Sequence, residues 1–309
     1  MMNRYNIYFV GSESSLISKI FIHNLINFSK NNKKFRLYKI ISYKKNLYKK
    51  PSNFKLKIIF FIYFFFSKKY FTRLKLIKTI EKKYKNISKQ AELNKNFCED
   101  FNNIDKMKIL KKSILISCGA PIIKKKTLQQ YLISINYHHA KLPEFRGVNS
   151  NGLELHKNKF YTYYSWHYMN EKIDKGFVFF KEKIKINKKI KHMFFYDIKK
   201  ITSTSKKINK ILSLAIAQKK NKYSTTKSKN YYSSAYFKKL FDNLKNFSFL
   251  QIKKYIDVFG GISYQGLFIT KVRKSKKGIE LKDCNIIITN IKHLPVCLYK
   301  IFKFMKFIK

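Results

Sequence analysis

The sequence predicts an α/β protein in which a mostly parallel sheet is flanked by helices and followed by a small, basic, strand-rich C-terminal domain. The first observation is a short apolar run at 5–10 that ends at Gly11 and leads into an amphipathic stretch at 16–28, the order of strand, turn and helix. The second is the continuous apolar run at 113–117, which is typical of a parallel strand buried on both faces. The third is a set of alternating runs near the C-terminus, such as 266–272, which are typical of short strands.

The remaining elements of the first half follow from the same patterns. Residues 35–42 predict a second strand, whereas the lysine-rich, aromatic segment at 43–90 has no clear assignment. A helix-like segment at 122–132 leads into a strand at 133–136. Two buried strands joined by a helix, each ending in small or polar residues, predict a ligand crevice at their carboxyl ends.

The second half alternates strand, helix and loop patterns. Residues 161–169 and 177–186 alternate like half-buried strands, and the polar turn at 170–176 between them contains Asp174. Residues 192–218 are helix-like, and the Ser, Thr, Asn and Lys that follow are typical of a linker. The predicted division is an α/β domain at 1–218, a linker at 219–234 and a C-terminal domain at 235–309.

Charge is the most extreme property of this 309-residue chain, because 68 Lys and Arg stand against 16 Asp and Glu and give a formal net charge of +52. Such an excess favours a polyanionic partner, either nucleic acid or an anionic membrane surface. Composition is the competing interpretation. Lys, Asn, Ile, Phe and Tyr dominate nearly every segment rather than one face, as expected for a protein encoded by an AT-rich genome.

The cysteines and apolar runs indicate a cytoplasmic protein. Its four cysteines are far apart and lack C-x-x-C spacing, which argues against a disulfide framework or a zinc site. The N-terminus reads as a first strand rather than a signal peptide. The most apolar run, 58–66, is much shorter than the ~20 residues that cross a bilayer, so we expect no transmembrane segment. Its flanking lysines leave a membrane-surface contact open beside burial in the core.

Asn136, His138 and Asp174 are the candidate catalytic residues. Asn136 and His138 are two apart on a predicted strand, so their side chains point to the same face. A carboxylate that reaches His138 would orient its ring and raise its pKa, and Asp174 lies in a tight turn between strands. Without a nearby nucleophile, this set suggests direct transfer to an incoming nucleophile, with imidazole as base and amide as oxyanion donor.

Structural roles compete with these assignments. A histidine at a strand end is often a hydrogen-bonded structural residue, and His139, on the opposite face, is expected to be one. Cys118 beside Gly119 fits a small buried hydrophobic residue better than a thiol nucleophile. A metal site would need several converging ligands, and the spacing of the histidines supports none. The histidines in question are His138, His139, His156 and His167.

Two motifs in this region resemble those of formyltransferases that use 10-formyltetrahydrofolate. The run 136–147, NYHHAKLPEFRG, is similar to the family signature N-x-H-x-S-L-L-P-x-Y-R-G. Residues 165–169, SWHYM, followed by 173–176, IDKG, resemble the family's T-x-H-x-M and x-D-x-G in the same order and spacing. The opening IYFVGSESS and the run SILISCGAPIIKK also resemble family strands. The resemblance implies a Rossmann-like formyltransferase domain at 1–218 and a folate formyl donor.

The resemblance also implies a role for each matched position. Asn136 would bind the developing oxyanion, His138 would help to remove the proton of the attacking amine, and Asp174 would hold and polarise His138. Folate contacts would come from the catalytic loop and from the turn before it, at Gly119, Ala140, Lys141, Leu142 and Pro143. Where the family usually has Ser-Leu-Leu-Pro, this chain has Ala-Lys-Leu-Pro, so the loop keeps its proline but loses a hydroxyl.

The motifs do not choose the acceptor amine. Methionyl-tRNA formyltransferases carry a basic C-terminal domain that holds tRNA, and the predicted two-domain layout agrees with theirs, so we expect methionyl-tRNA as acceptor and a monomeric enzyme. The expected tRNA contacts are Arg146, Lys253, Lys254, Lys271, Arg273, Lys274, Lys276 and Lys277.

Three alternatives remain for the reaction. The wording of the two motifs, including the pair Trp166 and His167, is closer to formyltransferases that act on sugar amines or on amino acids in natural-product assembly. A small or carrier-bound amine is therefore the alternative acceptor. A non-catalytic RNA-binding remnant of the fold is the second, and hydrolysis of the folate donor is the third.

Overall fold

The structure is a computed structural model that describes the ranges 4–12, 15–43, 98–187, 192–227, 230–243, 246–264, 267–275 and 278–286. Predictions for 44–90, including the apolar run at 58–66, and for Lys276, Lys277 and the end of the C-terminal domain after 286 lie outside these ranges. Within the described residues, no helix combines the length and the apolar character needed to span a bilayer.

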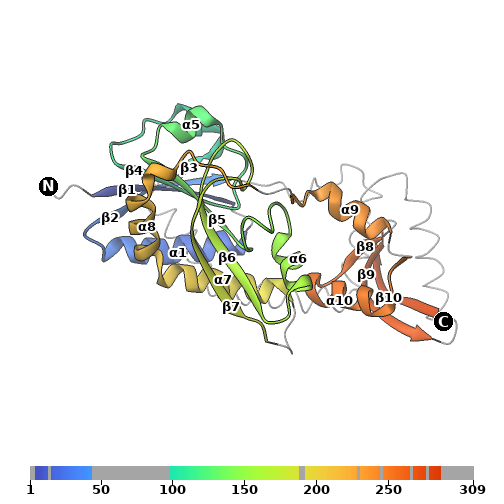
Figure 1. The fold of residues 1–309 in the computed structure, drawn as a ribbon. Coiled ribbons are helices and arrows are strands. Elements are labelled where there is room, and N and C mark those ends of the chain that lie inside the picture. The colour runs from blue at the N-terminus through green and yellow to red at the C-terminus, as the bar shows by residue number, and fades with distance from the viewer. Residues whose placement is uncertain are drawn as a thin grey trace.

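A seven-stranded sheet in the order β3-β2-β1-β4-β5-β6-β7 forms the centre of the protein (Figure 1). Strands β1 to β5 pair in parallel, while β6 pairs antiparallel with both β5 and β7. The strands are β1 (Tyr5–Ser12), β2 (Phe35–Tyr43), β3 (Cys98–Asp100), β4 (Ser113–Cys118), β5 (Ile133–His138), β6 (Tyr161–Tyr168) and β7 (Val178–Lys185). The predicted α/β fold with a mostly parallel sheet is confirmed.

Helices cover both faces of this sheet. Helices α1 (Leu16–Lys30), α7 (Met193–Lys206) and α8 (Ile208–Ala217) lie on one side, and α5 (Lys125–Gln129) and the 3-10 turn Phe101–Lys106 lie on the other (Figure 1). The predicted helix at 192–218 is thus two helices that meet at Lys207, and the predicted helix at 122–132 is a single short one.

Alternation along β1 divides the core into two layers. Ile7 and Phe9 pack with α1, α7 and α8 in one buried cluster, whereas Tyr8 and Val10 pack toward α5 in another. All four side chains have no exposed surface. A parallel strand that is apolar on both faces needs a helical layer on each side, and this need fixes the three-layer arrangement.

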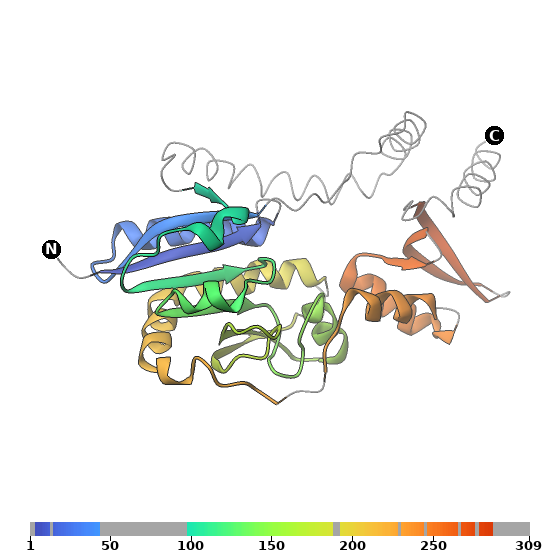
Figure 2. The same cartoon turned by 90° about the horizontal axis from the view of Figure 1, so that it is seen from above.

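The C-terminal part continues the buried core rather than standing apart from it. Helix α6 (Ser150–Lys157) packs against α10 (Phe249–Phe259), and their side chains share one hydrophobic cluster. A Cβ on Gly152 of α6 would lie 2.3 Å from the ring of Phe259, so only glycine permits this approach. Figure 2 shows α9, α10 and the small sheet beside the main sheet, next to α6.

The small sheet is an antiparallel meander, as its alternating sequence predicts. It consists of β8 (Ile262–Tyr264), β9 (Leu267–Ser275) and β10 (Gly278–Ile286), and it follows α9 (Ser234–Asp242) and α10. Helix α10 begins at a capping box formed by Ser248 and Gln251 and ends at Gly260, whose φ is +74°. Each end therefore has its backbone groups satisfied locally.

A buried ion pair ties the loop after β5 to the surrounding elements. Glu154 of α6 and Lys200 of α7 have no exposed surface, and their charged atoms lie 3.4 Å apart. The ammonium of Lys200 donates to the carbonyl of His139 at 2.6 Å, and Glu154 accepts from the backbone N–H of Lys141. Burial lowers the pKa of Lys200, and Glu154 opposes that shift. The pair therefore fixes the backbone of residues 139–141 through these two hydrogen bonds.

Replacement of Lys200 by Met is expected to lower the free energy of unfolding by ~3–5 kcal/mol, because Glu154 would be left buried without its cation. Urea denaturation measures the change. The Lys200→Met, Glu154→Gln double variant should recover part of the loss. Lys253→Met is the matched control, because its pair with Asp257 is exposed and such pairs contribute ~0–1 kcal/mol. A loss at Lys200 no larger than that of the control would contradict the assigned role.

Candidate active site

The switch from parallel to antiparallel pairing at β5 builds the candidate site. Asn136 and His138 lie on the same face of β5, at its carboxyl end. In the antiparallel register with β6, His167 stands opposite Asn136, and Ser165 stands opposite His138. A histidine from a strand that runs the other way therefore reaches the side chains predicted from the first motif.

Asp174 completes the cluster from the turn between β6 and β7. Its Oδ2 lies 3.6 Å from His138 Nδ1, and its Oδ1 lies 3.6 Å from His167 Nε2. The backbone N–H of Gly147 donates to Oδ2 at 2.9 Å. The structure thus brings together all three predicted catalytic residues. It adds His167, which lies within the second motif although the motif alone predicts no role for it in the site.

The turn that carries Asp174 is tightly constrained. Asp174 itself has a φ of +52°, in the left-handed region that is unusual for a residue with a side chain. At Gly176, a Cβ would lie 1.7 Å from the carbonyl oxygen of Tyr168, so the chain needs glycine there. These two positions aim the carboxylate back toward β5 rather than into solvent.

Hydrogen-bond partners define the tautomers of the two histidines. His138 Nε2 lies 2.7 Å from the carbonyl of Phe145, which can only accept, so Nε2 carries the proton and Nδ1 faces Asp174. His167 Nδ1 donates to the carbonyl of Tyr168 at 2.8 Å, so its Nε2 accepts from the amide of Asn136 at 3.1 Å. His138 Nδ1 is therefore the atom that can take up a proton, with Asp174 beside it.

Burial sets the charge states of this cluster. Desolvation lowers the pKa of His138 to about 4, although the nearby Asp174 carboxylate opposes the shift. Burial alone would raise the pKa of Asp174, but His138, His167 and the Gly147 N–H hold it below its ordinary value. Asp174 thus loses its proton while His138 is still charged. At neutral pH the site contains a carboxylate and a neutral imidazole.

The predicted folate-contact residues differ in their exposure to solvent. Ala140 and Leu142 have no exposed surface, and both bond through their backbone to the hydroxyl of Ser165. Lys141 forms an ion pair with Glu144 at 2.6 Å, and the Leu142–Pro143 peptide is cis. Gly119 is exposed at the end of β4, with open space around it.

The predicted tRNA-contact residues divide into two groups. Arg146 is only 5% exposed; its guanidinium donates to the carbonyl of Ile173 at 2.7 Å and lies over the ring of Tyr231. It supports the Asp174 turn. The other described candidates lie in the C-terminal part: Lys253, paired with Asp257, exposed Lys254 on α10, and Lys271, Arg273 and Lys274 on β9, the last two exposed.

The predicted linker is hydrogen-bonded to the loops of the candidate site, and we call its described residues 222–227 and 230–232 the strap. Near its start, the carbonyl of Ser224 accepts from Phe177 and the N–H of Thr226 donates to Lys175. Near its end, Tyr232 donates to the carbonyl of Arg146 and accepts from Val148. The strap therefore contacts the loop after β5 and the turn that carries Asp174.

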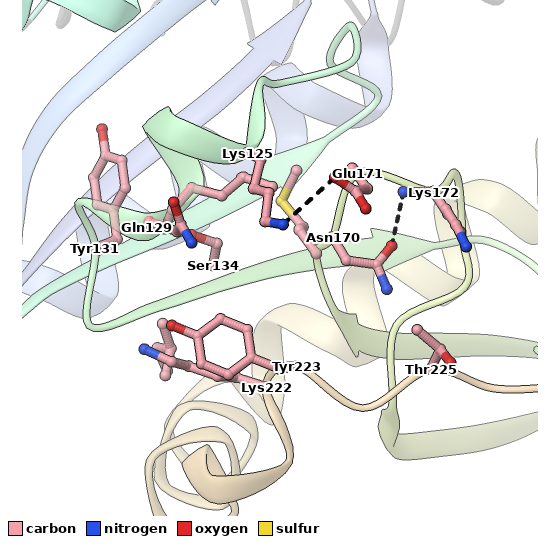
Figure 3. A pocket seen from close by; sticks show the side chains of 13 residues that line it. Lys125, Gln129, Tyr131, Ser134, Asn170, Glu171, Lys172, Lys222, Tyr223 and Thr225 are labelled. Carbon is pink, nitrogen blue, oxygen red and sulfur yellow. Dashed lines mark hydrogen bonds and ion pairs between the residues drawn. The ribbon is translucent and has the colours of Figure 1, made fainter.

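A pocket of about 450 Å³ opens near the start of β5 (Figure 3), and its lining includes none of the side chains of the cluster. Ser134 lines it and lies two residues before Asn136, so both side chains share one face of β5. Tyr223 of the strap and Lys222 approach from the side opposite Lys125 and Gln129 (Figure 3). The other residues of the lining include Tyr131, Met169, Asn170, Glu171, Lys172 and Thr225.

The pocket combines polar groups with aromatic surface. Lys125 pairs with Glu171 at 3.9 Å, while Tyr223 remains 67% exposed. An organic ligand of moderate size fits such a cavity, since ligand pockets commonly measure ~300–1,000 Å³. Among the described residues, no group of three or more His, Cys, Asp or Glu side chains is placed to hold a metal ion.

Comparison with known proteins connects this arrangement to formyl transfer. Residues 74–196 match the family model described as formyl transferase. A 4-N formyltransferase from Francisella tularensis has 16% identity and a TM-score of 0.52, covering 92% of this chain and 96% of its own. This chain has the formyltransferase fold. A sugar N-formyltransferase from Shewanella sp. shares it, with 14% identity, a TM-score of 0.51 and coverage of 93% and 99%.

Two further comparisons leave the acceptor open. A methionyl-tRNA formyltransferase from Clostridium thermocellum also matches, with 16% identity, coverage of 92% of this chain and 99% of its own, and a TM-score of 0.46. That likeness is too low to weigh for either acceptor. No curated protein matches the chain at significant similarity. Methionyl-tRNA specificity is therefore not confirmed.

Stability is expected to fall as the pH drops from 6.5 to 4. Burial lowers the pKa of His138, His139 and His156 to about 4. Above 6.5 these groups are neutral in both states, and below it only the unfolded chain takes up protons. Asp197 opposes this trend, because burial raises its pKa to about 6. Below that pH the folded state binds one proton that the unfolded chain does not yet bind. Each net proton contributes a slope of ~1.4 kcal/mol per pH unit.

Urea denaturation across this pH range tests the expectation. His156→Gln should reduce the slope by about one proton, because His156 stacks on Tyr255 away from the catalytic cluster. Stability that does not change between pH 6.5 and 4 would show that the buried histidines are not held neutral.

Replacement of Gly147 by Ala is expected to release the strap. Gly147 has a φ of +95°, and a Cβ there would lie 2.4 Å from the carbonyl oxygen of Tyr232. Backbone amide exchange at Thr226 and Tyr232 should become faster, and the free energy of unfolding should fall. Gly119→Ala is the control, because it has a φ of +68° but no neighbour within 4 Å. Equal losses of unfolding free energy in both variants would show that the positive φ, and not the contact with Tyr232, causes the effect.

Proposed function

We propose that this protein transfers a formyl group from 10-formyltetrahydrofolate to the amino group of a small acceptor. The observation that carries the proposal is the convergence of Asn136, His138 and Asp174, through His167, at the carboxyl end of β5. The matched formyl transferase model and the shared fold support it. The proposal makes the three predicted residues catalytic and adds His167 as the residue that orients Asn136.

The pocket beside Ser134 is the proposed donor site. Its dimensions suit the flat pterin ring, for which Tyr223 offers an aromatic face and Asn170 an amide. The ammonium groups of Lys172 and Lys222 would attract the carboxylates of the glutamate tail at the mouth. A ring held next to Ser134 would bring the formyl-bearing nitrogen toward Asn136, one step further along the same face of β5.

Each polar group of the cluster has a distinct task in this reaction. The amide of Asn136 donates one hydrogen to His167, and its second hydrogen is the donor proposed for the formyl oxygen as that oxygen gains negative charge. His138 Nδ1 takes the proton that the attacking amine loses. The Asp174 carboxylate stabilises the resulting imidazolium. The same proton then returns to the departing folate nitrogen as the carbon–nitrogen bond breaks.

The burial of His138 supports its proposed role as the general base. A general base must be neutral before it can accept a proton, and the low pKa of His138, about 4, keeps it neutral at physiological pH. A neutral imidazole in low dielectric is a weak base by itself, but the charge on Asp174 becomes favourable once the imidazole is protonated. The pair is therefore arranged to stabilise a proton that arrives during the reaction.

An amino sugar is the acceptor that we place first. Of the two structures with a TM-score above 0.5 that are described above, one is named a sugar N-formyltransferase and the other a 4-N formyltransferase. The wording of the two sequence motifs favours the same class. The buried Arg146 argues in the same direction, because it holds the Asp174 turn and is not offered to a polyanion.

Methionyl-tRNA is the second candidate acceptor. The net charge of +52 and the exposed Lys254, Arg273 and Lys274 favour it, because phosphate contacts dominate nucleic-acid affinity. Product analysis separates the two. Purified protein is incubated with 10-formyltetrahydrofolate and either a panel of nucleotide-linked amino sugars or methionyl-tRNA. A formylated sugar without formyl-methionyl-tRNA supports the first acceptor, and the reverse result replaces it.

Removal of the catalytic groups is expected to abolish most turnover without unfolding the protein. Asn136→Ala should lower kcat ~10²–10³-fold as an oxyanion donor is lost, and His138→Ala should lower it ~10²–10⁴-fold as a base is lost. Formation of tetrahydrofolate is measured spectroscopically, with the amine that the product analysis identifies as the acceptor. His156→Gln is the matched control, because this histidine lies outside the cluster. Near-normal turnover in either catalytic variant would remove that residue from the mechanism.

A further inference from the structure

A second cavity, of about 620 Å³, lies at the opposite end of β6 from the candidate active site. Its lining includes Phe160 and Tyr161, where β6 begins, and Ile186, just after β7. Tyr161 and His167 are six residues apart along one strand, which separates their backbone positions by roughly 20 Å. The cavity is therefore distinct from the pocket beside Ser134.

Two aromatic rings are exposed side by side in the chain at this cavity. Phe160 is 64% exposed and Tyr161 is 39% exposed. The backbone beneath them is fixed, because the N–H of Ile186 donates to the carbonyl of Phe160 and Tyr161 pairs with Lys185 across the strand ladder. Exposed aromatic surface on a rigid support is unfavourable in water, and such surface marks sites where a partner binds.

Lysines surround these rings. Lys159, Lys185 and Lys199 line the cavity, and the ammonium of Lys183 lies 4.9 Å from the centroid of the Tyr161 ring. No carboxylate belongs to this lining, in contrast with the pocket beside Ser134, where Glu171 faces Lys125. Within the part of the chain that the structure describes, none of the four lysines forms an ion pair. Their charge is therefore available to an anion.

The lysines of β7 lie in a line along the strand rather than in one compact cluster. Lys181, Lys183 and Lys185 alternate along the strand and are exposed, so they share one face at intervals of ~7 Å. A row of positive charge suits a chain of phosphates better than a single phosphate. A concave cavity with rings in its wall also suits a base that enters it better than a flat lipid surface does.

We propose that this cavity binds single-stranded RNA. A nucleobase stacks on Phe160 or Tyr161, and the phosphates on either side of it contact the lysines of β7 together with Lys159 and Lys199. This combination of aromatic faces and a basic track is how proteins bind single strands without reading their sequence. The inference goes beyond the proposed formyl transfer and does not depend on it.

Fluorescence anisotropy of a labelled 12-nucleotide oligouridylate with the full chain tests the proposal, measured over a series of salt concentrations. Phe160→Ala is expected to weaken binding about fivefold or more at every salt concentration, because stacking is lost. Lys183→Gln with Lys185→Gln is expected to reduce the slope of log affinity against log salt by about 1.4, since each contact to a single strand contributes ~0.7.

A charge-matched control separates this cavity from the general positive charge. Lys106→Gln with Lys108→Gln removes two exposed lysines elsewhere and should change the slope by much less. Phe160→Ala should keep the thermal stability and formyl transfer of the wild type. In the unaltered protein, an oligonucleotide that carries 4-thiouridine should crosslink under ultraviolet light to the peptide that contains Phe160 and Tyr161.

Three results would overturn the proposal. The first is an oligouridylate affinity that does not change in Phe160→Ala, together with a crosslink that maps to a peptide without Phe160 and Tyr161. The second is a salt slope that both double lysine variants reduce equally, which would assign the binding to diffuse charge. The third is binding of this face to phosphatidylserine vesicles, lost in Phe160→Ala, without binding to the oligonucleotide.

Discussion

The carboxylate of Asp174 is the interaction on which the candidate site depends. Its two oxygens face two different histidines, His138 from the loop end of β5 and His167 from β6. A buried carboxylate requires compensation. The backbone N–H of Gly147 donates to Oδ2, and a proton taken up by His138 would place a positive charge beside the same oxygen. The three segments that carry these groups must therefore stay in register with one another.

The surrounding structure is organised to keep that register. Arg146 bonds the carbonyl next to Asp174, and the strap bonds the loops on both sides of the site. Beneath them, the buried pair of Glu154 and Lys200 holds the backbone that follows His138. Since the strap leads directly into α9, the position of the C-terminal part is linked by backbone hydrogen bonds to the geometry of the cluster.

The lysines of this chain have different structural environments in different parts of the molecule. Lys200 is buried and paired, Lys253 is paired on the surface, and Lys183 lies against an exposed aromatic ring. An AT-rich genome would account for the abundance of lysine. It would not account for exposed aromatic rings beside lysines that, within the described residues, form no ion pair. The charge of the chain therefore does not identify the acceptor, and any role in RNA binding has to be sought at particular surfaces.

The sequence by itself predicted the mostly parallel sheet and the candidate catalytic residues. Apolar runs without alternation require burial on both faces, so β1 and β4 follow from local pattern, and the spacing of Asn136 and His138 on β5 puts both on one face. Only the tertiary structure decided what surrounds them. It broke the predicted helix at Lys207, turned the predicted linker into a strap and brought His167 opposite Asn136. These features depend on antiparallel register and on backbone contacts between distant segments, and no local pattern encodes such contacts.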